Sequence, residues 1–206
     1  MRRSRAWLSR GSTVIEVLMA ITVLAVGASG IIAMQKLAAV SNRNAKNLEI
    51  ANEVARTWVE RLQGDAMLWN HPSQLDGAAD LGDTRWLVNV RDPNAEMWFR
   101  PEDGGMYGVH DAFGKDDTSG TLAGPFCVNL RLTWLRPGGT ERASVMRAEV
   151  RVYWLRDGIQ SSADVLPDAP DPLCGDTWNA PPAVDATPEL FHFLHVTTAV
   201  RKNQPL

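Results

Sequence analysis

The sequence predicts an α+β protein in which one long N-terminal helix packs against an antiparallel β-sheet. Three features of the 206 residues lead to this class: an uncharged apolar run near the N-terminus, a helical repeat directly after it, and strict apolar–polar alternation in two later segments. Apolar residues make up 45% of the chain and include eight tryptophans, which is enough material for a core. The length suits one anchored domain of ordinary size.

The apolar run spans Val17 to Met34, eighteen residues without a charge, a proline or a side-chain amide. A helix needs about 20 mostly apolar residues, within a range of about 17–25, to cross a bilayer. The leader before it, residues 1–11, is basic and is expected to stay in the cytoplasm, so the chain after the run lies outside. The positive charges of the leader are Arg2, Arg3, Arg5 and Arg10.

The helix is predicted to continue beyond the membrane, from about Thr13 to Gln63. Residues 12–35 form the membrane half of this prediction, and residues 36–63 form an amphipathic half. The amphipathic half contains no proline, and Gly64 is the nearby stop signal. Its apolar residues recur at three- and four-residue steps, the period of one helical face: Leu48, Ala51, Ala55, Trp58, Val59 and Leu62.

Residues 64–206 are predicted to form a β-rich head with four strands. Alternation with one polar face is typical of half-buried antiparallel strands, and it is strict over 126–134 and 147–154. Shorter signals predict a strand at 86–90 and a last strand from about Leu190 to Val200. Turns and loops lie between them: Pro137-Gly138-Gly139, which favours a hairpin, and Gly-, Asp- and Pro-rich insertions at about 92–125 and 156–188.

Charge and motif content argue against several function classes. The chain carries 21 basic and 24 acidic residues, a formal charge of −3. A nucleic-acid-binding protein would show a basic patch or stripe, so no nucleic-acid partner is expected. The sequence has no nucleophile elbow and no phosphate-binding glycine loop, so no enzyme and no cofactor are predicted. Weak calcium candidates lie in one glycine-rich loop, although EF-hand spacing is absent: Asp111, Asp116 and Asp117.

Two cysteines, Cys127 and Cys174, lie on the predicted outer side of the membrane. An oxidising compartment favours pairing them, and such a cross-link would stabilise the fold by about 4 kcal/mol on the chain-entropy account. The disulfide would tie the 156–188 insertion to a central strand. The alternative is that both are unpaired, small hydrophobic residues.

The junction between leader and apolar run carries the most specific motif, Gly11-Ser12-Thr13-Val14-Ile15-Glu16. It resembles the class III prepilin signal of type IV pilins and type II secretion pseudopilins. The resemblance implies cleavage between Gly11 and Ser12 by a membrane-embedded prepilin peptidase, followed by N-methylation of Ser12. It also implies a pilin fold. In that family the first mature residue is usually phenylalanine, and here it is serine.

Glu16 is the chemically unusual residue of the junction, because a carboxylate at the entrance of an apolar span is costly unless it is paired. Cleavage would leave a cationic α-amine on Ser12, four residues before Glu16 and on the same helical face. The amine of one subunit could then pair with Glu16 of a neighbour, which offsets the cost of burying both charges. Alternatively, Glu16 is a favourable charge at a helix N-terminus, lying at the headgroup level.

Three other interpretations of the N-terminus stay open. A removable secretory signal would be cut near Ala28-Ser29-Gly30, although Glu16 at the start of the apolar region argues against it. A twin-arginine signal at Arg2-Arg3 lacks its usual surroundings. An ordinary signal anchor needs no further feature.

Within the family, two stretches resemble PilV-type minor pilins: Val17-Leu18-Met19-Ala20 and Gly27-Ala28-Ser29-Gly30-Ile31-Ile32-Ala33-Met34-Gln35. This resemblance implies a low-abundance subunit that starts pilus assembly or lies near the pilus tip. Its partners would be other minor pilins, the major pilin, prepilin peptidase and a tip adhesin. It would begin as a single-pass inner-membrane precursor with a periplasmic head and end on the cell surface.

Two alternatives to a minor pilin remain. The N-terminus also resembles the I-type minor pseudopilin of type II secretion, whose head tends to be shorter. A membrane-anchored binding module is a third class, in which loop aromatic residues capture a ligand. The residues for such a surface are Trp69, Trp98, Tyr107 and Trp178.

Overall fold

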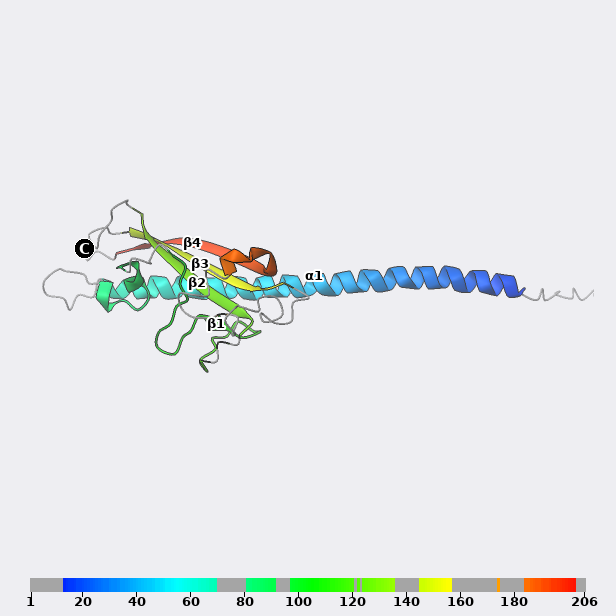
Figure 1. Cartoon of the computed structure of the whole chain (residues 1–206), viewed down its shortest axis with the longest axis horizontal. Helices are drawn as coiled ribbons and strands as arrows, with labels where there is room; N and C mark the ends of the chain where they lie inside the picture. Colours follow the sequence, from blue (N-terminus) through cyan, green and yellow to red (C-terminus); the bar gives the residue numbers. More distant parts are fainter. Residues whose placement is uncertain are drawn as a thin grey trace, which may run out of the picture. The chain divides into compact units, whose positions relative to one another are not determined.

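A computed structural model describes residues 13–69, 81–91, 97–120, 122, 124–135, 145–156, 174 and 184–202. The predicted α+β class is confirmed: one long helix accompanies a four-stranded antiparallel sheet (Figure 1). The elements are α1 (Val14–Leu68), the 3₁₀-helices η1 (Leu81–Asp83), η2 (Leu87–Arg91) and η3 (Pro188–Leu190), and the strands β1 (Val109–His110), β2 (Phe126–Trp134), β3 (Val145–Leu155) and β4 (Phe191–Arg201).

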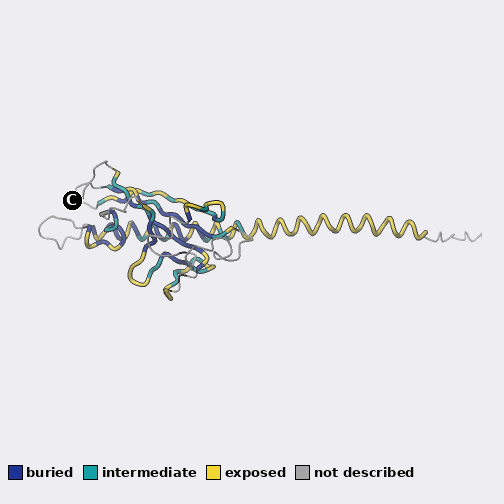
Figure 2. Tube along the Cα trace, in the orientation of Figure 1, coloured by how far each residue is buried: buried dark blue, intermediate teal, exposed yellow. Residues whose placement is uncertain are grey.

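The first half of α1 is a unit by itself. This unit ends at Ala45, and every residue from Val14 to Arg43 is exposed (Figure 2). None of the described residues covers its apolar side chains. Its helical form therefore depends on backbone hydrogen bonds within the segment, which is what a lipid environment requires. Gly27 and Gly30 remain helical here, although glycine costs about 1 kcal/mol relative to alanine.

The sheet has the order β1-β2-β3-β4, and every neighbouring pair is antiparallel. The long β2–β3 pairing, from Cys127↔Tyr153 to Trp134↔Met146, is the hairpin that the alternation predicted. The turn residues Pro137-Gly138-Gly139 lie outside the described residues. β4 pairs with β3 along its whole length, from Leu155↔Phe191 to Val145↔Arg201.

The core lies between the second half of α1 and one face of the sheet. Trp58 and Leu62 of α1 are fully buried against that face. The predicted helical face is correct for most of its members, but Leu48 is 46% exposed and Val54, which the pattern missed, is buried. Burial on α1 therefore begins about one turn later than the repeat indicated. The core residues of the sheet alternate as expected: Val128, Leu130 and Leu132 on β2, and Ala148, Val150 and Val152 on β3.

The predicted helix end at Gly64 is wrong, because α1 continues to Leu68. Asp65 and Ala66 are both buried, and burial of this last turn outweighs the helix penalty of one glycine, which is about 1 kcal/mol. The carboxylate of Asp65 accepts hydrogen bonds from three backbone N–H groups, those of Arg85 at 2.7 Å, Trp86 at 2.9 Å and Leu87 at 3.0 Å.

The strand predicted at 86–90 is also wrong, because Leu87–Arg91 forms the 3₁₀-helix η2. The residues that face the core here are Trp86, Leu87 and Val90. Their spacing is that of a helical turn, whereas the alternation had selected Val88, which is only partly buried. The physical reason is Asp65, whose carboxylate satisfies the first N–H groups of η2 as a capping residue does.

The fourth strand comes instead from the insertion predicted as a loop at 92–125. β1 pairs with β2 through Val109↔Cys127 and His110↔Phe126. Gly108 precedes it with φ +62°, and a Cβ there would lie 2.9 Å from the Pro101 ring. Glycine therefore permits both the left-handed backbone and the close approach.

The outer face of the sheet is more buried than simple alternation indicates. Asn129, Arg151 and Tyr153 point to this face and are at most 3% exposed. A second apolar cluster covers part of it and contains the predicted disulfide, Cys127–Cys174, with a Cα–Cα distance of 5.3 Å. The disulfide joins Cys174, within the 156–188 insertion, to β2, as predicted. Most of that insertion lies outside the described residues.

Candidate functional site

The exposed apolar half of α1 carries Glu16 in its first turn. The Thr13 carbonyl begins the helix by accepting hydrogen bonds from the N–H groups of Glu16 at 2.9 Å and Val17 at 3.2 Å. By length and composition this helix is able to cross a membrane. Glu16 is exposed, and none of the described residues binds its carboxylate. The cleavage residues Gly11 and Ser12 lie outside the described residues.

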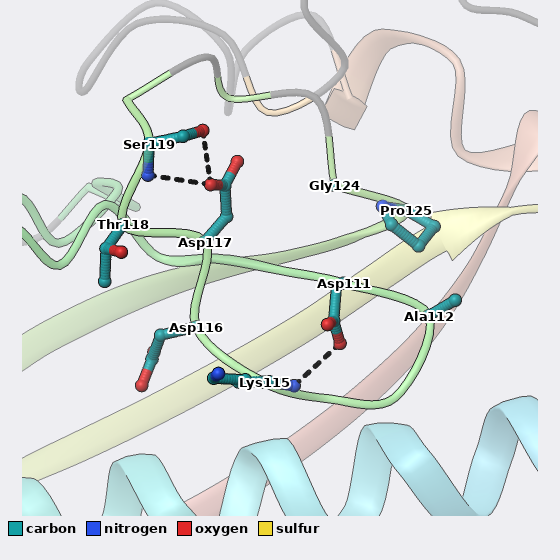
Figure 3. Close-up of a pocket in the computed structure, with 9 residues that line it drawn as sticks. All are labelled: Asp111, Ala112, Lys115, Asp116, Asp117, Thr118, Ser119, Gly124 and Pro125. Atoms are coloured by element: carbon teal, nitrogen blue, oxygen red, sulfur yellow. Dashed lines mark hydrogen bonds between the residues drawn. The ribbon is translucent and has the colours of Figure 1, made fainter.

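The three calcium candidates line an open pocket of about 490 Å³, with Ser119 and Pro125 among the other lining residues (Figure 3). Their carboxylates do not converge. Asp111 accepts hydrogen bonds from the N–H groups of Phe113 and Lys115, and Asp117 accepts from Ser119. Asp111 and Asp117 thus each shape their own turn. Among the described residues, no group of three acidic, histidine or cysteine side chains is placed to hold a metal.

Asp116 has a different role, because it joins the pocket loop to α1. Both carboxylate oxygens accept hydrogen bonds from Arg61 of α1, one of them at 2.9 Å. One oxygen also lies 3.1 Å from Nε2 of His110, which is fully enclosed. The hydrogen bond from His110, followed by the contact with Arg61, holds the pKa of Asp116 well below its ordinary range, although partial burial opposes the shift.

Nε2 of His110 has two neighbours and only one proton or lone pair to offer. It lies 3.3 Å from the Trp58 indole nitrogen and 3.1 Å from Asp116. One nitrogen cannot accept from the first and donate to the second. We assign the proton to Nε2 and the bond to Asp116, because an ionised carboxylate is the stronger acceptor. The Trp58 and His110 rings then meet edge to face, with centroids 6.3 Å apart.

We expect Asp116→Asn to lower the free energy of unfolding at pH 7 by about 2 kcal/mol, the scale of hydrogen bonds to a charged group. A carboxyl with a depressed folded pKa contributes stability above its unfolded pKa, near 3.9, and loses it as pH falls further. The difference between the native chain and the variant should therefore shrink below about pH 4. Urea unfolding of the full chain in mild detergent, followed by tryptophan fluorescence, measures both values.

Glu53→Gln is the matched control, because Glu53 is an exposed acid on α1, the helix that carries Arg61. It should leave the free energy of unfolding within about 0.5 kcal/mol. An Asp116→Asn difference that stays constant from pH 7 to pH 3 would contradict the ionic origin of the effect.

A stacked arrangement occupies the outer face of the sheet. The Trp98 ring lies over two guanidinium groups, with its centroid 4.6 Å from Cζ of Arg131 and 4.5 Å from Cζ of Arg151. Its edge meets the His195 ring at 5.7 Å. Glu149 binds Arg131 through both carboxylate oxygens, at 2.6 and 3.1 Å. Burial, followed by repulsion from the two arginines, lowers the pKa of His195.

The loop aromatic residues considered for ligand capture therefore contact the chain itself. Trp69 is fully buried and packs against Trp134, with ring centroids 5.8 Å apart. Trp98 lies on the arginines of the sheet, and Tyr107 packs against the apolar cluster around the disulfide. Trp178 lies outside the described residues. Of the three described rings, Trp69 is fully buried and therefore cannot belong to an open binding surface.

Sequence reasoning missed Arg61, His110 and Asp65 as organising residues. Arg61 and Asp116 are 55 positions apart, and no local pattern connects them. The only available signal was indirect: a charged residue such as Arg61 stands next to apolar helix positions, where an unpaired charge is costly.

No family model, no curated protein and no solved structure matches the chain. The roles of the site residues are therefore inferred from their geometry.

Proposed function

We propose that this protein is a minor pilin, similar to the PilV type, that joins a type IV pilus or its initiating complex. In this proposal the leader 1–11 is removed at Gly11-Ser12, and Ser12 is methylated. The apolar half of α1 first holds the chain in the inner membrane and later packs among other pilins. The head is displayed on the outer side.

One observation carries the proposal: a helix of 55 residues whose first half is fully exposed and begins with an apolar stretch, residues 14–35, in which Glu16 is the only charged residue. Exposed apolar surface of this extent requires a lipid or protein environment. A plain anchor does not need a carboxylate at this position, whereas lateral assembly of helices gives it a partner. The α+β head built on the second half of α1 agrees with the same class.

The Glu16 carboxylate would act by charge pairing and not by catalysis. A new α-amine at Ser12 is cationic at neutral pH, since such groups have a pKa near 7.7–8.0. In an apolar helix bundle each charge is costly alone, so the pair forms only when two subunits are in register. The pair therefore selects one axial offset between neighbouring helices.

Mass spectrometry of the mature N-terminus tests the processing step. We expect the native chain to begin at Ser12 and to carry one methyl group on its α-amine. A chain that begins at Ile31 would identify a removable secretory signal, and a chain that retains Met1 would identify an ordinary anchor. Either result contradicts the proposal.

A deletion strain separates the two filament systems. Loss of surface pili with normal protein secretion supports the minor pilin. Loss of secretion with normal pili would replace it with a minor pseudopilin of type II secretion, which shares the N-terminal motif.

A further inference from the structure

β4 is a long edge strand of the sheet. In the part of the chain that the structure describes, it pairs with β3 alone and lies at the end of the sheet opposite β1 (Figure 1). Its eleven residues, Phe191–Arg201, are all in register with β3. An edge of this length presents a row of backbone N–H and C=O groups that another strand can use.

The register shows which groups are available. Arg156 donates its N–H to the Leu190 carbonyl at 3.0 Å, so that pair is of the hydrogen-bonded type. Antiparallel pairs alternate between bonded and non-bonded types, so the even-numbered residues of β4 bond to β3. The backbone groups of the odd-numbered residues therefore point away from the sheet. Leu135 bonding to Val145 on the β2 side follows the same alternation.

These outward groups have no partner among the described residues. Among the residues that the structure describes, none forms a hydrogen bond with the free-edge backbone of Phe193, His195, Thr197 or Ala199. The Phe191 carbonyl is different, because it accepts a hydrogen bond from the Arg156 side chain at 3.0 Å. The available stretch thus begins at Phe193.

Among the described residues, the edge also lacks the usual side chains that protect against pairing. Natural edge strands carry lysine, proline or inward charges that block another strand. From Phe191 to Val200 there is no proline, lysine, arginine or acid. Thr197 and Ala199 are exposed and small, so a neighbouring backbone meets little steric resistance. The only fixed charges are at the end, on Arg201 and Lys202.

We propose that the free edge of β4 binds an extended segment of a partner protein as a fifth, antiparallel strand. Main-chain hydrogen bonds supply the affinity in this mode, and alternate side chains supply the specificity. The segment carries acidic residues at its N-terminal end, because antiparallel alignment places that end beside Arg201 and Lys202. A second copy would bring only one acid, Glu189, to these two cations, so a segment with two acids at its N-terminal end matches them better. The proposal rests on the sheet edge and is independent of Glu16.

A synthetic peptide tests the edge directly. The probe begins with two glutamates and continues with alternating valine and threonine, and it is added to the full chain in mild detergent. Amide hydrogen exchange should slow by at least about tenfold at Phe193, His195, Thr197 and Ala199. A control peptide with the glutamates at its C-terminal end should bind more weakly. A peptide that is N-methylated at alternate amides should produce no slowing.

Thr197→Pro removes one outward N–H while leaving the β3 ladder intact, and Thr197→Val is the matched control that keeps it. The proline variant should lose affinity for the probe by about tenfold, the scale of one or two hydrogen bonds. The valine variant should bind as the native chain does. Unchanged exchange protection of Leu194 and Val196 checks that the proline variant is folded. The N-methylated peptide tests backbone pairing without any variant of the protein.

Three results would overturn the proposal: no slowing of exchange with the probe, equal binding by the proline and valine variants, or equal binding of the two peptides that differ in charge placement. Self-association of the native chain that disappears in Thr197→Pro would also overturn it, because the occupant would then be a second copy.

Discussion

Glu16→Ala should reduce incorporation of the chain into pili or minor-pilin complexes by at least about a hundredfold. The reason is that the α-amine of a neighbouring subunit would be buried without its partner, which costs about 3–5 kcal/mol. Membrane insertion and cleavage at Gly11 should be unchanged, since neither uses the carboxylate. Quantitative immunoblotting of sheared filaments and of membrane fractions measures the two effects separately.

Glu49→Ala is a suitable control for this experiment. Glu49 is an exposed acid on the same helix, outside the apolar half. Its removal should leave incorporation within about twofold, because an exposed surface charge contributes little. Glu16→Gln should behave like the alanine variant, since it keeps the size and removes the charge. Normal incorporation of Glu16→Ala would exclude the pairing role and leave only a charge at a helix N-terminus.

Asp65→Ala should lower the free energy of unfolding by about 3–4 kcal/mol, because it leaves three backbone N–H groups without an acceptor and each such group costs about 1–3 kcal/mol. Asp65 is 4% exposed, so water replaces the carboxylate poorly. Trp86 packs edge to face on Trp58 at 5.4 Å. Loss of the cap should therefore change tryptophan fluorescence before global unfolding.

The control for Asp65 is an acid on the same helix whose ion pair is exposed. Glu60 bonds Arg56 at 3.1 Å, and their side chains are 63% and 75% exposed. Glu60→Ala should cost at most about 0.5 kcal/mol. Amide exchange at Arg85, Trp86 and Leu87 should accelerate in Asp65→Ala and not in Glu60→Ala. Equal stability of the two variants would mean that the cap does not hold η2 in place.

Local patterns predicted those elements whose cause is local. The apolar run indicated the exposed half of α1, since length and absence of charge are properties of a single segment. Alternation over 126–134 and 147–154 predicted β2 and β3, because burial on one face imposes a period of two. The last strand was placed within about one residue of β4. The cysteine pair was also predicted correctly, as two cysteines in an oxidising compartment allow only one bond.

Errors occurred where a distant residue outweighed the local signal. Gly64 reads as a helix end, yet the burial of Ala66 extends α1 by a further turn. Trp86, Val88 and Val90 alternate as a strand would, yet Asp65 caps this segment and turns it into η2. Both errors have the same origin, because Asp65 lies 20 to 22 positions from the groups that it binds.

The sequence by itself determined that this protein has a long apolar helix with one acid at its entrance, a β-rich head and two cysteines able to pair. Only the tertiary structure decided where α1 ends, that Cys127 pairs with Cys174, that Asp116 binds Arg61, and that β4 lies at the edge of the described sheet. The physical reason is the distance along the sequence over which each effect acts. Periodicity and charge density act within one segment, whereas capping, ion pairing and strand order depend on residues that meet only after the chain has folded.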